Sequence, residues 1–139
     1  MILTEKEFLK CYKCNKSGKK GALFLKKRNV LPLFPSPELS SIVGHLIGDG
    51  SFSKDQYVGE FRFFGSENKL QIIQKKVWNI FKISPKRFYE RKGGFVLRYN
   101  NCTASRVLCL IGVPRGNKVM KAFSIPKWIK KRNNEGGFY

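Results

Sequence analysis

The chain has 139 residues, and its 28 lysines and arginines against 9 acidic residues give a formal net charge of +19, a balance typical of proteins that bind a polyanion such as nucleic acid. A hydrophobic content of 42% and an aromatic content of 14% exclude a disordered basic tail, and the length suffices for a buried core. No apolar run is long enough to span a membrane and no signal-peptide pattern opens the chain, so we expect a cytoplasmic protein.

Residues 1–35 are expected to form a basic appendage, separate from a domain at residues 36–139. A helix signal at Thr4–Glu7 is followed by a polar break at Asn15–Gly18 and an apolar patch at Ala22–Leu25. This pattern predicts a short helical or hairpin appendage, and a degenerate DNA-binding element is one interpretation of its lysines.

The four cysteines are expected to be free thiols. Cys11 and Cys14 form a C-x-x-C pair, but Cys102 and Cys109 are seven residues apart and cannot supply the second pair of a zinc ribbon. We expect Cys102 and Cys109 to lie on one face of a helix as small buried hydrophobic residues.

A helix is predicted from Pro37 to Asp49. Ser36 suits the N-cap, Pro37 suits the first helical position, and Gly50 suits the left-handed position after the helix. Gly44 and Gly48 lie four residues apart on one face, which predicts close packing against another helix.

Asp49 ends this helix beside carbonyl groups that have no intrahelical partners, where a carboxylate is electrostatically unfavourable. A Mg²⁺ ion bound by the Asp49 carboxylate and the Gly48 carbonyl would explain its presence, because Mg²⁺ prefers hard oxygen ligands. An ordinary Asp-Gly turn is the alternative. We interpret His45, the single histidine, as a helix position with structural neighbours.

Two hairpins and two helices are predicted after Gly50. Ser51–Phe64 predicts a hairpin around Lys54–Gln56, and Ser66 caps a helix with an apolar stripe at Leu70, Ile73, Val77 and Ile80. Lys86–Glu90 and Phe95–Asn100 predict a second hairpin, and Asn101 caps a helix that ends near Gly112. This order predicts an α+β fold in which one antiparallel sheet is covered on one side.

The uncovered side of this sheet is expected to bind DNA. Alternation along the strands places basic and polar side chains on one face, where arginine can pair with guanine and asparagine with adenine. The candidate DNA-binding residues are Arg62, Arg87, Tyr89, Arg91, Arg98 and Asn100. A solvated polar sheet face is the alternative, and the sequence does not decide between DNA and RNA.

The segment Ile42–Gly50 resembles the motif that names the LAGLIDADG homing endonucleases. Gly44, Asp49 and Gly50 match the motif, whereas His45 and Ile47 depart from it. A second stretch, Gly112–Lys118 followed by Ile125–Ile129, is similar to the segment that precedes the second motif in two-motif members. The resemblance implies an α-β-β-α-β-β-α domain whose antiparallel sheet forms a DNA-binding saddle.

The resemblance also implies a chemistry. In that family two motif helices pack together and bring two aspartates to divalent metal ions that activate water for phosphodiester hydrolysis. Gly44 and Gly48 would then form the dimer interface, Asp49 and Gly48 would hold Mg²⁺, and Lys118 would be the basic catalytic residue. The expected function is cleavage of double-stranded DNA by a homodimer or with a complementary second half.

A non-cleaving DNA- or RNA-binding relative, such as a transcriptional regulator or a splicing maturase, is the alternative. Phe64-Gly65 favours it, because the resembling enzymes often place a polar residue at this strand end. A self-splicing intein fragment is disfavoured, because the chain begins with Met1 rather than a nucleophile and lacks a His-Asn ending.

Overall fold

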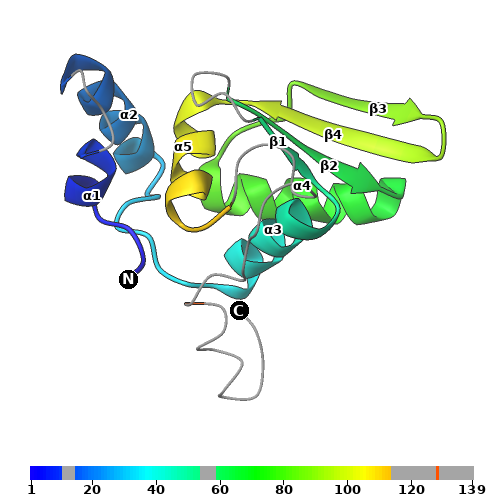
Figure 1. Ribbon diagram of the computed structural model, residues 1–139, viewed down its shortest axis with the longest axis horizontal. Helices are drawn as coiled ribbons and strands as arrows, with labels where there is room; N and C mark the ends of the chain where they lie inside the picture. Colours follow the sequence, from blue (N-terminus) through cyan, green and yellow to red (C-terminus); the bar gives the residue numbers. More distant parts are fainter. Residues whose placement is uncertain (11–14, 54–58, 114–127, 129–139) are drawn as a thin grey trace.

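The protein is described here by a computed structural model, which covers residues 1–10, 15–53, 59–113 and 128. These residues form an α+β fold with five helices and a four-stranded antiparallel sheet of strand order β1-β2-β4-β3. Figure 1 shows α3 and α4 beside the sheet and α1, α2 and α5 toward one end of it. The expected α+β class with one antiparallel sheet is confirmed.

The elements follow the predicted order from residue 36 onward. They are α1 (Glu5–Leu9), α2 (Asn15–Lys27), α3 (Pro37–Gly48), β1 (Ser51–Phe52), β2 (Glu60–Gly65), α4 (Glu67–Phe81), β3 (Arg87–Arg91), β4 (Gly94–Asn100) and α5 (Cys102–Leu110). Within the described ranges, no helix is long and apolar enough to cross a membrane.

Side-chain caps fix where the three helices of the sheet region begin. The Ser36 hydroxyl accepts a hydrogen bond from the Leu39 amide at 3.1 Å, and the Ser66 hydroxyl accepts one from the Lys69 amide at 3.3 Å. The Asn101 side chain accepts one from the Ala104 amide at 2.9 Å. Each bond satisfies an amide that has no partner inside its helix, so all three predicted caps are confirmed.

The N-terminal region differs from the prediction at Asn15–Gly18. This stretch was expected to interrupt the structure, but α2 begins at Asn15 and continues to Lys27. Gly18 and Gly21 are buried in α2. Packing against α1 and α5 therefore outweighs the low helix propensity of these residues.

The buried core lies between the sheet and helices α3, α4 and α5. Phe61, Phe63, Leu97 and Tyr99 contribute from the sheet, and all are at most 1% exposed. Three of the four predicted stripe residues of α4 are buried, while Ile80 is only partly buried and Phe81 takes the innermost position instead. Leu3, Phe8 and Leu25 join the same buried cluster, although the boundary expected at residue 35 stays a prediction.

The cysteine prediction is only partly correct. Cys102 and Cys109 form no disulfide, as expected, but Cys102 is exposed and Cys109 is half-buried. Cys102 is the first residue of α5 after the Asn101 cap, which places it at the surface. Cys11 and Cys14 lie outside the described residues.

Candidate nucleic-acid interface

The sheet has one helix-covered face and one face that carries arginines and rings. Phe61 pairs with Tyr99, and Phe63 pairs with Leu97, which is also the partner of Phe88, so these side chains share the covered face. Strand alternation places the neighbouring residues on the opposite face. We call this opposite face the open face; it consists of Glu60, Arg62, Phe64, Arg87, Tyr89, Arg91, Val96, Arg98 and Asn100.

Three arginines form a row across three strands of the open face. Arg62 of β2 lies directly opposite Arg98 of β4, and Arg98 lies directly opposite Arg87 of β3. Directly opposed like charges repel, so this arrangement needs a nearby counter-charge or an anionic ligand.

Glu60 supplies part of that counter-charge. Its carboxylate forms an ion pair with Arg62 and a second one with Arg98, at 3.1 Å from the Nε atom. The side chains of Arg62 and Arg98 remain 33% and 27% exposed. Glu60 therefore holds two arginines in fixed positions beside a third, which leaves the open face with a net positive charge.

A second row, of apolar side chains, lies next to the arginines. Phe64 of β2 and Tyr89 of β3 are both paired with Val96 of β4. Val96 is only 1% exposed, whereas the two rings are half-buried. The Arg87 guanidinium lies 4.2 Å from the centre of the Tyr89 ring, close enough for a cation–π interaction. The open face thus offers two accessible rings beside a line of cations.

The structure brings together all six residues that the sequence proposed as nucleic-acid contacts. Arg62, Arg87, Tyr89, Arg91 and Arg98 share the open face with Asn100, which is exposed at the end of β4. Phe64 was missed as a contact, because it was interpreted only as the absence of a polar residue. The alternation that placed Arg62 on this face also places Phe64 there, so the signal was present.

Asp49, the residue predicted to bind Mg²⁺, lies at the exposed end of α3. Asp49 caps α3, its side chain is 71% exposed, and its Oδ2 atom lies 3.9 Å from the Lys69 ammonium. In the parts of the chain that are described, no group of three or more histidine, cysteine or acidic residues is arranged to hold a metal. Lys118 lies outside the described residues.

The glycines of the motif segment have separate roles. A Cβ atom built on Gly44 or Gly48 would meet nothing within 4 Å, so this helix face has room for a neighbour. Gly50 does not adopt the left-handed backbone that was predicted, because its φ is not among the positive values. Glycine is needed there for space: a Cβ would lie 2.7 Å from the Leu46 Cα and 2.9 Å from the Arg62 carbonyl oxygen.

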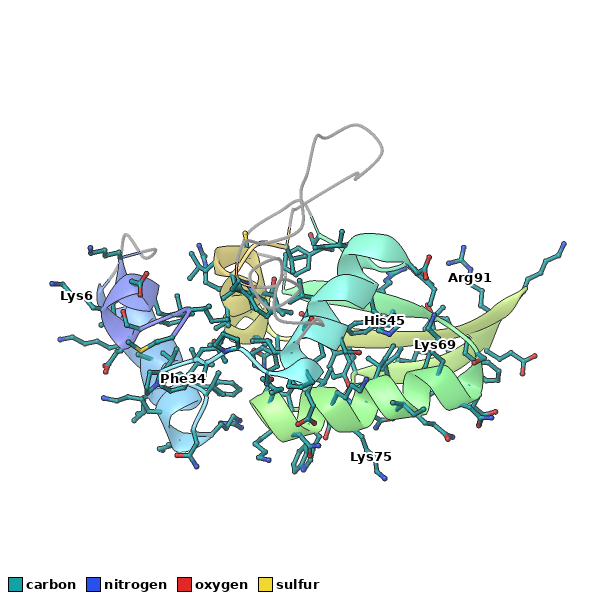
Figure 2. All side chains as sticks on the ribbon, turned by 90° about the horizontal axis from the view of Figure 1, so that it is seen from below. Lys6, Phe34, His45, Lys69, Lys75 and Arg91 are labelled. Atoms are coloured by element: carbon teal, nitrogen blue, oxygen red, sulfur yellow. The ribbon has the colours of Figure 1, made fainter. Side chains whose placement is uncertain are left out.

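His45 is a residue of α3, and its side chain lies near Lys69 of α4 (Figure 2). Burial lowers the pKa of His45 below its ordinary value, and the positive charges of Lys69 and Lys76 lower it further, while Asp49 opposes them. The imidazole is therefore neutral near pH 7, in agreement with its interpretation as a helix position with structural neighbours.

Comparison with known proteins gives one informative relative. No protein-family model and no solved structure matches the chain. The curated protein "tRNA-splicing ligase RtcB" of Pyrococcus furiosus is 31% identical over 140 aligned positions, which cover 84% of this chain and 14% of the relative. The chain therefore spans a small part of that protein's length.

This similarity corrects the main functional prediction. The sequence analysis expected a LAGLIDADG-type endonuclease that cleaves double-stranded DNA, whereas the relative is named as a ligase of tRNA splicing. The prediction of DNA cleavage was wrong, because a nine-residue motif and a basic sheet are compatible with several nucleic-acid functions. Mg²⁺ at Asp49 and the homodimer stay predictions.

Proposed function

We propose that this chain is an RNA-binding domain that holds single-stranded RNA on the open face of its sheet. The observation that supports this most directly is the row of Arg62, Arg98 and Arg87 beside the half-buried rings of Phe64 and Tyr89. Arginines bind phosphates and base edges, and aromatic rings stack on bases. Both contacts are then available to one strand.

Stacking favours an unpaired strand over a duplex. A base inside a duplex is already stacked on its neighbours, and the major groove of an RNA duplex is too narrow for side chains to read. The half-buried rings of Phe64 and Tyr89 lie on the sheet, where an unpaired base can stack on them. We therefore assign loops or single-stranded segments as the RNA target.

The choice of RNA over DNA rests on the relative. Its printed name connects a protein that contains a similar segment with tRNA splicing. We propose binding rather than ligation, because the similarity covers only 14% of that protein. This corresponds to the non-cleaving, RNA-binding alternative of the sequence analysis. The finer expectation of a saddle-shaped LAGLIDADG-like sheet stays a prediction.

The test compares charge removal at the open face with equal charge removal elsewhere. The variant Arg87→Gln/Arg91→Gln removes two exposed arginines of β3, and the control Lys20→Gln/Lys27→Gln removes two exposed lysines of α2. Binding of a labelled single-stranded RNA of about 12 nucleotides is measured by fluorescence anisotropy. The arginine variant should lose at least about tenfold in affinity, and the control should lose much less.

Three results would contradict the proposal. Equal losses in both variants would mean that net charge alone attracts RNA and that the sheet is not the site. Tighter binding to an RNA duplex than to the single strand would exclude stacking on the rings. The variant Phe64→Leu removes one ring without a change of charge. Unchanged RNA affinity in this variant would independently exclude stacking on the rings.

A further inference from the structure

A groove runs along the flank of α4 that faces away from α3. Lys69 and Lys76 mark the flank toward α3, since they lie beside Asp49 and donate to Ser41, respectively. Gln71, Gln74 and Trp78 occupy the opposite flank, and residues 83–85 form the other wall. The groove has a volume of about 600 Å³.

Trp78 is the largest side chain of this groove and is 50% exposed. An indole that is left half in solvent on a helix is a costly use of apolar surface unless a ligand covers it. Ile72, which also lines the groove, is 56% exposed. The groove therefore presents a flat aromatic surface with an apolar border.

Polar groups along the groove can contact an RNA strand. Gln74 lies one helical turn from Trp78, whereas Gln71 and Asn68 lie about 10 and about 15 Å from Trp78 along α4, and each carboxamide carries both a donor and an acceptor. Ser84 adds a hydroxyl and Lys75 adds a positive charge. The described lining residues include no carboxylate, so nothing in this set repels a phosphate.

We infer that this groove binds an unpaired segment of an RNA strand, with one nucleobase stacked on Trp78 and hydrogen-bonded by the Gln74 carboxamide. The inference rests on the proposed function, since it adds a second contact for the same class of ligand. Charge complementarity favours RNA as the ligand, because a chain of net charge +19 with a lysine at the groove attracts polyanions. An aromatic ring with a carboxamide beside it suits a base better than it suits an aliphatic side chain.

The groove lies on the other side of the molecule from the open face, yet a basic segment connects them. In Figure 2, Lys75 projects from α4 away from the sheet, and Arg91 projects from the β3–β4 hairpin toward the other side. Ser84 and Pro85 line the groove, and the exposed Lys86 and Arg87 follow directly at the start of the outer strand β3. A strand that crosses this edge can contact both sites.

The test uses the intrinsic fluorescence of Trp78. The chain has two tryptophans, so the variant Trp128→Phe leaves Trp78 as the reporter. Single-stranded RNA of about 12 nucleotides should quench its emission, because stacking on a base quenches indole fluorescence. In the wild-type background, Trp78→Leu should lower RNA affinity about tenfold, whereas Trp78→Phe, which keeps a ring, should retain most of it.

The outcomes separate this inference from the proposed function. In one outcome, RNA binding depends on Arg87 and Arg91, but RNA does not change Trp78 emission and Trp78→Leu binds RNA as tightly as the wild type. The groove is then not an RNA site, whereas the sheet remains one. If Trp78→Phe loses as much affinity as Trp78→Leu, stacking is excluded. If the wild-type protein binds no RNA, both proposals are wrong.

Discussion

The hydroxyl of Tyr99 is a polar atom buried in the core. Tyr99 is fully buried, and its ring stacks on Phe61 with centroids 5.1 Å apart and meets the edge of Phe63 at 6.1 Å. Its hydroxyl has no hydrogen-bond partner in the described part of the structure. Burial also raises the pKa of Tyr99, so the phenol stays protonated at all ordinary pH values.

Tyr99→Phe is expected to stabilise the fold by about 1 kcal/mol, because it removes a desolvated hydroxyl and keeps the ring contacts. The free energy of unfolding from urea denaturation measures this effect. Tyr89→Phe, on the open face, is the matched control and should leave stability unchanged. A loss of about 1 kcal/mol or more in Tyr99→Phe would reveal a hydrogen bond to this hydroxyl.

His45 makes stability depend on pH in a defined direction. Its pKa is lowered in the folded state, so the unfolded chain binds the proton more readily. Stability is therefore fully present above the ordinary histidine pKa of about 6.5 and decreases as the pH falls through and below that value. Melting temperatures at about pH 7.5 and about pH 5.5 should show a smaller acid-induced decrease in His45→Gln than in the wild type. Equal decreases would mean that His45 titrates as it does in the unfolded chain.

At the scale of elements, local signals predicted helices and strands where capping and alternation decide them. Ser36, Ser66 and Asn101 marked helix starts that the structure confirms, because a cap acts within three residues. Alternation correctly placed Phe61 and Arg62 on opposite faces of β2. Such signals depend on neighbours in the sequence, so they can be recognised without the fold.

Features that depend on distant contacts were not predicted. The helix through Gly18 forms because α2 packs against α1 and α5, and Gly50 is required because the Arg62 carbonyl lies close to it. The second row of the open face was also missed, since Phe64, Val96 and Tyr89 come together only through strand pairing. The strand order β1-β2-β4-β3 therefore places residues that are distant in the sequence side by side in the candidate site.

For the whole molecule, which has a net charge of +19, the number of phosphate contacts determines how RNA binding depends on salt. Each phosphate contact with a single strand contributes a slope of about −0.7 to a plot of log association constant against log salt concentration. Arg87→Gln/Arg91→Gln should reduce that slope by about 1.4, measured over roughly 50 to 300 mM salt. Phe64→Leu should weaken binding with the slope unchanged, because stacking releases no counterions. Equal slopes in the arginine variant and the wild type would show that these arginines contact no phosphates.

The arginines of β3 have a second consequence, which concerns aggregation. β3 is an outer strand of the described sheet, and an outer strand offers backbone groups that can pair with a strand of another molecule. Arg87, Glu90 and Arg91 are exposed along it, and charged side chains on an edge disfavour such pairing. The arginines proposed to hold RNA thus also disfavour intermolecular sheet formation through this edge, which a flat, uncharged strand would allow.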